Sequence, residues 1–168
     1  DNPGTFYGAN PSSYLWDGSN FWSGDAYGYH SGENSVPGHF TLDLGVTTQL
    51  TKAYFDFRPT WNYAGNNPTE LEIWAREDLD SAETLPVFES SGNSVTSSPV
   101  SPATFQNAGW ELIAQQSIDG ANTNSAEIEI PVGDMYRYIR IRYVSTVGGS
   151  GCQFIEMTFH GMGAFPSN

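Results

Sequence analysis

Apolar and polar residues alternate along several short segments of this chain, and helical periodicity is nearly absent. The alternation is clearest in Arg137-Tyr-Ile-Arg-Ile-Arg-Tyr143, where isoleucine and arginine alternate. A strand with this repeat buries one face and leaves the other in water, as strands of antiparallel sheets do. Comparable runs occupy 40–44, 54–57, 70–75 and 128–130. The chain is therefore predicted to be all-β.

Clusters of glycine, proline and asparagine separate these runs, as expected for a sandwich or barrel with long end loops. The first forty residues predict mainly loop with one short strand, and an irregular insertion covers about 81–108. A loop of that length is either without order or functional. The 168 residues fit a single domain, 1–168, because 38% of them are hydrophobic and can build a sizeable core.

The chain is strongly acidic, with a formal net charge of −13 and Lys52 as its only lysine. Such a chain repels phosphate backbones and anionic lipids, so nucleic acid and acidic membranes are not expected partners. No apolar run approaches the roughly 18 residues of a membrane helix, so no direct insertion into a membrane is predicted. Few lysines, many Asn, Ser and Thr residues and no initiating methionine favour a mature or trimmed, exported protein, extracellular or at the cell surface.

Seven segments occur in an order and rough spacing that resemble the discoidin family, also called the coagulation-factor type C domain. They are Trp16-Asp-Gly18, His39–Gly45, Phe55-Asp-Phe-Arg58, Glu70–Ala75, Gly109–Ile113, Arg137–Tyr143 and Ile155–Gly161, the last interpreted as a strand that stops at its glycine. The combination with Glu70-Leu-Glu-Ile-Trp74 is most similar to versions in outer-membrane glycan-utilisation lipoproteins of gut Bacteroidetes.

The resemblance implies a galactose-binding-like, antiparallel jelly-roll β-sandwich of about eight strands. It also implies a non-catalytic module that binds a glycan, often of galactose type, among the loops at one end of the sandwich. Members of the family also bind other surface proteins through the same fold without a sugar site, and this is the alternative function. Lipid head-group binding, a third use of the fold, conflicts with the negative charge.

The resemblance further implies a structural calcium ion (Ca²⁺) where the early Asp-Gly loop meets the last strand. The matching side chains are Asp17, Asn20 and Glu156. Calcium takes six to eight hard oxygen ligands, which carboxylates, amides and backbone carbonyls supply. The alternative interpretation is that Glu156 faces solvent on its strand and that Asp17 is an ordinary turn residue.

A sugar site needs an aromatic plate for the pyranose face and rigid polar groups for the hydroxyls. The segment Arg58-Pro-Thr-Trp-Asn-Tyr-Ala-Gly-Asn-Asn67 contains both, and Trp61, Asn62 and Tyr63 lie outside any alternating run. Arg58 matches an arginine that often contacts the ligand in sugar-binding relatives. The alternatives are that Trp61 folds back onto the sandwich and that Arg58 pairs with Asp56 or Asp43.

A second aromatic loop, 21–30, matches the segment that often forms the facing wall of the site in relatives, and its candidates are Tyr27, Tyr29 and His30. Trp16 and Trp22 are expected to fill the core beneath the loops. His39 is expected to be structural, and His160 is expected to be a surface residue at the end of a strand.

No catalytic motif of the serine-hydrolase, zinc-protease or phosphate-loop type is present. Cys152, the only cysteine, cannot form an intrachain disulfide and is expected to be a buried thiol. The pairs Glu70 with Glu72 and Glu127 with Glu129 alternate with core residues, which predicts an outer sheet face away from any cleft. We therefore predict that the protein is not an enzyme.

Overall fold

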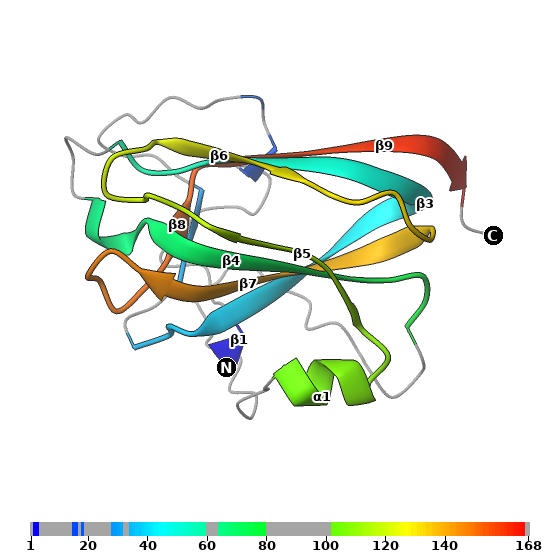
Figure 1. The fold of residues 1–168 in the computed structure, drawn as a ribbon, viewed down its shortest axis with the longest axis horizontal. Coiled ribbons are helices and arrows are strands. Elements are labelled where there is room, and N and C mark those ends of the chain that lie inside the picture. Colours follow the sequence, from blue (N-terminus) through cyan, green and yellow to red (C-terminus); the bar gives the residue numbers. More distant parts are fainter. Residues whose placement is uncertain are drawn as a thin grey trace.

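In a computed structural model the chain folds as a β-sandwich (Figure 1). The structure describes residues 2–3, 15–16, 18, 28–31, 34–59, 64–79 and 102–166. Within these ranges, no helix is long and apolar enough to cross a membrane.

The first sheet has the strand order β1-β3-β7-β4-β5. Its strands are β1 (Asn2–Pro3), β3 (Gly38–Asp56), β7 (Tyr136–Thr146), β4 (Pro68–Arg76) and β5 (Glu111–Ser117). All neighbours are antiparallel except β1 and β3, which are parallel. The second sheet places β3 between β6 (Ser125–Glu129) and β9 (Glu156–Pro166). A separate antiparallel pair joins β2 (Tyr29–His30) to β8 (Gln153–Phe154).

Strand β3 belongs to both sheets, because its first half pairs with β7 and its second half with β9 and β6 (Figure 1). The pairing with β7 shifts register between Asp43 and Thr48. Gly45 lies inside this irregularity with φ +71°, a value that favours glycine, and its N–H donates to Asp43 Oδ1 at 2.8 Å. The sequence predicted two separate runs here, whereas the bulge at Gly45 bends one continuous strand from sheet to sheet.

Strand β9 does not stop at Gly161, where the sequence predicted an end, but continues to Pro166. The continuation pairs with the middle of β3, around Val46 and Thr47. A glycine inside a paired strand keeps its backbone hydrogen bonds, so the backbone ladder outweighs the local preference for a turn.

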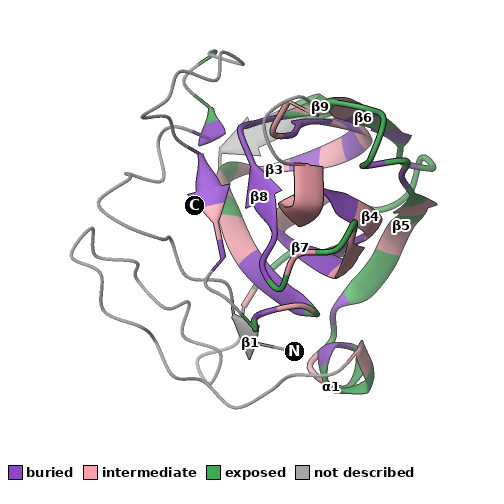
Figure 2. Cartoon of the chain, turned by 90° about the vertical axis from the view of Figure 1, so that its left-hand side faces the viewer, coloured by how far each residue is buried: buried purple, intermediate pink, exposed green. Residues whose placement is uncertain are grey.

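The core lies between the sheets, and the inward residues of both contribute to it (Figure 2). Phe40, Ile73 and Ile141 come from the first sheet, and Phe55 and Ile128 come from the second. Each of these side chains is at most 3% exposed. The predicted burial of Cys152 is confirmed, and burial raises the pKa of its thiol. His39 is also buried, in keeping with a structural role.

Helix α1 (Pro102–Asn107) covers the outer face of the first sheet and forms a small second core there. Phe105 of the helix packs edge-on against Trp74, with ring centroids 5.4 Å apart. The Arg140 guanidinium lies over Phe105 at 4.7 Å and over Trp110 at 4.0 Å. The helix occupies the end of the predicted irregular insertion, and positions 80–101 lie outside the described residues.

This outer layer changes the environment of Glu72, which the sequence placed on an open outer face. Glu72 is 8% exposed and forms an ion pair with Arg142, with Oε1 and Nη1 3.0 Å apart. The Trp74 indole N–H donates to its other oxygen at 2.9 Å. The residue is on the predicted face, but its neighbours bury it.

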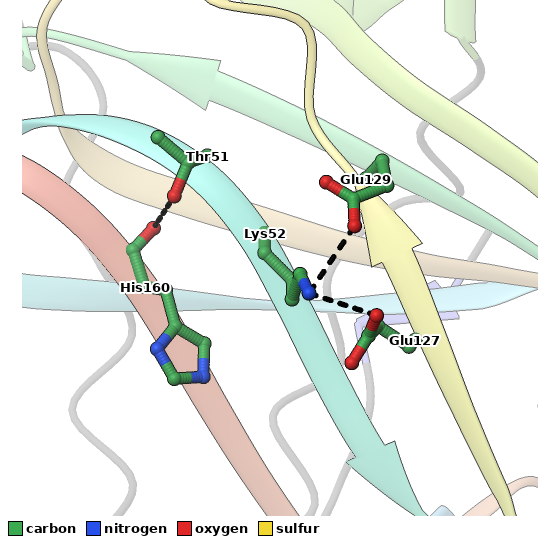
Figure 3. Close-up of polar contacts among 5 residues, drawn as sticks. All are labelled: Thr51, Lys52, Glu127, Glu129 and His160. Carbon is green, nitrogen blue, oxygen red and sulfur yellow. Dashed lines mark hydrogen bonds and ion pairs between the residues drawn. The ribbon is translucent and has the colours of Figure 1, made fainter.

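The outer face of the second sheet is solvated, as the sequence predicted for Glu127 and Glu129. The Lys52 ammonium lies 2.8 Å from Glu127 and 3.2 Å from Glu129 (Figure 3). His160 lies opposite Lys52 on the neighbouring strand and is exposed, as expected. It lies within β9 rather than at the strand's end.

Candidate binding site

Several connecting segments meet at one end of the sandwich, which Figure 2 views end-on. We call this the loop end, made of residues 57–59, 64–67, 118–124 and 146–150 together with His30. Backbone bonds join these segments to one another: Phe57 N–H donates to Asn124 O at 2.7 Å, and Gly149 N–H donates to Gly65 O at 2.7 Å. Backbone hydrogen bonds therefore connect the segments of the loop end to one another.

Asn67 holds three of these segments together. Its side-chain NH₂ donates to Arg58 O at 2.8 Å and to Gly120 O at 3.1 Å, and its own carbonyl accepts from Val147 N–H at 3.1 Å. The residue is fully buried. Its removal would leave buried carbonyls without donors, which costs about 1 to 3 kcal/mol per group.

His30 joins the loop end through Asn66, which belongs to the short helix η3 (Ala64–Asn66). Asn66 Nδ2 lies 2.9 Å from His30 Nε2. Because the amide nitrogen can only donate, the imidazole accepts at Nε2 in this arrangement. Gly149 leaves room for the pair, since any side chain at that position would collide with Asn66.

Arg58 lies two residues after the end of β3 and is half-buried, with its carbonyl fixed by Asn67. Trp61, Asn62 and Tyr63 lie outside the described residues, but the residues on either side, Pro59 and Ala64, belong to the loop end. The structure thus places two residues that were predicted to contact a ligand, Arg58 and His30, at the same end of the sandwich. Asp43, one of the alternative partners weighed for Arg58, makes a two-bond ion pair with Arg137 at 2.8 Å.

Tyr29 was predicted to contact a ligand, and that prediction is wrong. Its side chain is fully buried in the main core, and its hydroxyl lies 2.8 Å from the Tyr143 hydroxyl. Burial raises the pKa of both phenols. Pairing of β2 with β8 turns Tyr29 inward and leaves His30 as the neighbour that reaches the loop end. Tyr27 lies outside the described residues.

Trp16 was expected to fill the core, and this prediction is also wrong. The adjacent Leu15 is fully buried and occupies the core position, while Trp16 is 48% exposed. Trp16 and Gly18 line a cavity of about 540 Å³ together with residues 42–44 of β3 and 156–159 of β9. Trp22 lies outside the described residues.

Glu156 does not face solvent, since it is 7% exposed at the first position of β9. It pairs across the sheet with Asp56, whose Oδ1 accepts from the Tyr54 hydroxyl at 3.0 Å. Burial raises the pKa of Asp56. Both residues are largely buried, and their carboxylates are hard-oxygen donors of the type that calcium takes, so they fit as part of a shell for this ion.

The Asp-Gly loop adjoins the start of β9, because Gly18 and Glu156 line the same cavity. Asp17 and Asn20 lie outside the described residues. Among the residues that are described, no group of three or more His, Cys, Asp or Glu side chains is arranged to hold a metal. A calcium site here would therefore need donors from Asp17 or Asn20.

The sequence matches one known family of protein domains. A family model, DUF5000, described as a domain of unknown function, matches residues 16–161. The chain belongs to the DUF5000 family. A search of curated proteins finds no match.

Several solved structures have the same fold as this DUF5000 domain. A SusE-like protein, BT2857, is 21% identical with a TM-score of 0.66, over 96% of this chain and 92% of that one. A family 32 carbohydrate-binding module from NanJ of Clostridium perfringens, solved with galactose, is 16% identical with a TM-score of 0.58, over 92% and 88%. A fucose-binding module from Streptococcus pneumoniae is 16% identical with a TM-score of 0.57, over 95% and 90%.

These similarities confirm the predicted fold, an antiparallel β-sandwich of the galactose-binding-like type seen in discoidin-like carbohydrate-binding modules. At such identities they establish the fold of the DUF5000 domain rather than its ligand. Sequence reasoning had not singled out Asn66 and Asn67, although both follow the aromatic segment. The two consecutive asparagines before a strand could have indicated this role, because asparagine side chains commonly form hydrogen bonds with nearby backbone groups.

Proposed function

We propose that this domain is a non-catalytic carbohydrate-binding module that holds a neutral glycan, of galactose type, at the loop end. The observation that carries the proposal is that Arg58 and the His30–Asn66 pair lie at the same end of the sandwich, where Asn67 bonds the Arg58 backbone carbonyl. Rigid polar groups of this kind bind sugar hydroxyls without a large entropy cost on binding.

In this proposal Trp61 and Tyr63 supply the aromatic plate against a pyranose face, and Arg58 donates to hydroxyls. His30 and Asn62 add directional hydrogen bonds. The similarity to modules solved with galactose or with GalNAc-β-1,3-galactose supports a glycan as the ligand class. The similarity to a SusE-like protein supports an exported protein at a cell surface, where other surface proteins are the alternative partners.

A glycan array with the wild-type domain, Arg58→Ala and Trp61→Ala tests this proposal. Binding of galactose-type glycans by the wild type, reduced about tenfold or more in both variants, is the expected result. Lys52→Ala is the matched control, because it also removes a cation but from the outer face of the second sheet. Equal binding by all variants would discard the loop end as the site. No binding to any glycan, with retention of a surface protein in pull-downs, would replace the function with protein interaction.

We also propose a structural calcium ion held by Asp17, Asn20 and Glu156, with Asp56 beside Glu156. Because calcium would bind the folded state alone, millimolar CaCl₂ should raise the melting temperature relative to EDTA. Glu156→Gln should remove this difference, whereas Glu129→Gln on an exposed position of β6 should preserve it. The same melting temperature with CaCl₂ and EDTA in the wild type would rule out the site.

A further inference from the structure

The cavity beside Trp16 lies between parts of β3 and β9. We call it the edge cleft, and its lining consists of Trp16, Gly18, residues 42–44 and residues 156–159. Its volume of about 540 Å³ lies within the range of about 300 to 1,000 Å³ that is typical of small-ligand sites. None of these lining residues belongs to the loop end.

The apolar part of the edge cleft combines one open aromatic ring with a fixed floor. Trp16 is half-exposed, yet the fully buried Leu15 anchors the backbone next to it. Leu42, Leu44 and Phe159 pack against the main core and are only partly buried. An indole that the core does not need, held beside a rigid apolar floor, can stack on the face of a ring.

The polar part of the lining consists of two carboxylates and a hydroxyl, from Asp43, Glu156 and Thr158. Asp43 accepts from Arg137 through both carboxylate oxygens and from Gly45 N–H, each at 2.8 Å. These bonds, led by those from Arg137, lower the pKa of Asp43, so it is ionised at neutral pH. Thr158 is exposed, and Glu156, which is 7% exposed, also lines the cleft. Such groups accept hydrogen bonds from neutral hydroxyls and repel anions.

We propose that the edge cleft is a second saccharide site, which stacks one neutral sugar ring on Trp16 and binds its hydroxyls through Asp43 and Thr158. The composition argues against other occupants. The Asp43 carboxylate and a net charge of −13 disfavour sulfated or sialylated sugars and lipid phosphates. An apolar peptide helix would remove water from the Asp43 carboxylate and offer it no new hydrogen bond.

Indole N–H signals in a ¹⁵N NMR titration test the site, because each tryptophan side chain gives one signal. The Trp16 signal is assigned by its loss in Trp16→Phe, and the probe is GalNAc-β-1,3-galactose. We expect the Trp16 signal to shift saturably in the wild type and equally in Arg58→Ala. Calorimetry should then give two sugars per domain for the wild type and one for Trp16→Ala.

The outcomes separate this inference from the function proposed for the loop end. If other indole signals shift in the wild type but not in Arg58→Ala, and the Trp16 signal does not move, the edge cleft is not a sugar site and the loop-end site stands. A Trp16 shift retained in Arg58→Ala, with no other binding, would support the cleft and remove the loop-end site. A Trp16 shift lost in Arg58→Ala would show one continuous site and overturn a second one. No shift with any neutral sugar would overturn both.

Two controls address fold and ligand class. Leu112→Ala removes another exposed apolar side chain, on β5 outside the cleft, and should leave both binding steps unchanged. Its melting temperature and that of Trp16→Ala should stay close to the wild type, since both residues are about half-exposed. Galactose 6-sulfate should shift the Trp16 signal about tenfold more weakly than galactose. Equal affinity for both sugars would overturn the assignment to neutral saccharides.

Discussion

At the scale of single residues, the buried ion pair between Glu72 and Arg142 is the most consequential polar contact outside the candidate sites. The two side chains are only 11% and 10% exposed, and Trp74 also donates to Glu72. A buried ion pair adds little to the stability of the fold compared with an apolar replacement. Loss of one partner, however, leaves the other charge buried and unpaired in a region of low dielectric constant.

We therefore expect Glu72→Gln to lower the free energy of unfolding by about 3 kcal/mol. Glu127→Gln is the matched control, since Glu127 is also ion-paired, 2.8 Å from Lys52, but exposed, and its loss should change stability little. Urea denaturation of both variants measures the difference. Equal, small effects would mean that water reaches the Glu72 pair.

His39 makes stability depend on pH on the acid side. Burial, together with the nearby Arg140, lowers its pKa to about 3. Its ring packs edge-on against Phe105, 5.0 Å between centroids. The unfolded chain takes up this proton near pH 6.5 and the folded chain only near pH 3, so stability should decline as pH falls through that interval.

The expected slope from His39 approaches about 1.4 kcal/mol per pH unit near pH 4.5. The measurement is the free energy of unfolding between pH 7 and pH 4 for the wild type and His39→Gln. The difference between the two curves should shrink toward low pH, because only the wild type carries the titrating imidazole. Parallel curves would contradict a neutral, buried His39.

The two residue predictions that failed share a cause. Trp16 and Tyr29 lie in segments rich in glycine, serine and asparagine, where no alternation indicates which aromatic ring turns inward. Leu15 took the core position beside Trp16, and pairing with β8 set the direction of Tyr29. These choices depend on contacts across more than a hundred residues. Arg58 and His30, next to recognisable landmarks, both lie at the loop end, and their contact with a ligand stays a prediction.

At the scale of elements, the alternation of apolar and polar residues predicted the strands well, but it did not predict the helix that packs on the outer face of the first sheet. The alternating runs at 70–75 and 137–143 became β4 and β7 as expected. The covering of Trp74 by α1 was not predictable, because alternation reports burial against one partner layer only. The continuity of β3 was hidden by Gly45, which resembles a turn in sequence and serves as a bulge in the sheet.

Helix α1 is held mainly by Phe105, which is fully buried and contacts Trp74, His39 and Arg140. Phe105→Ala should therefore lower the free energy of unfolding by about 3 to 5 kcal/mol. Gln106→Ala, at an exposed position of the same helix, should have little effect. Thermal unfolding of the two variants distinguishes a packed layer from a loosely attached helix, for which both would behave alike.

At the scale of the whole molecule, charge governs which surfaces the domain can approach. The chain has 19 acidic residues against 6 lysines and arginines. Several of the cations are already engaged, among them Lys52, Arg137 and Arg142. Little positive field is left to attract a polyanion.

We expect no co-sedimentation with vesicles of phosphatidylserine and phosphatidylcholine at 0.15 M salt. The pelleted fraction should equal that with phosphatidylcholine alone. Binding to the anionic vesicles that weakens as salt is raised would show a basic surface and revive the lipid-binding use of this fold.

The sharing of β3 between the sheets also has a consequence for biosynthesis. Asp56, which ends β3, pairs with Glu156, which opens β9, so the partner strand is made a hundred residues later. At about 5 to 20 residues per second, the ribosome leaves one edge of β3 unmatched for about 5 to 20 s. During that time Leu50, Ala53 and Phe55, all buried in the finished domain, lack the strand that completes their sheet. The nascent chain should therefore depend on chaperones until its last strand emerges.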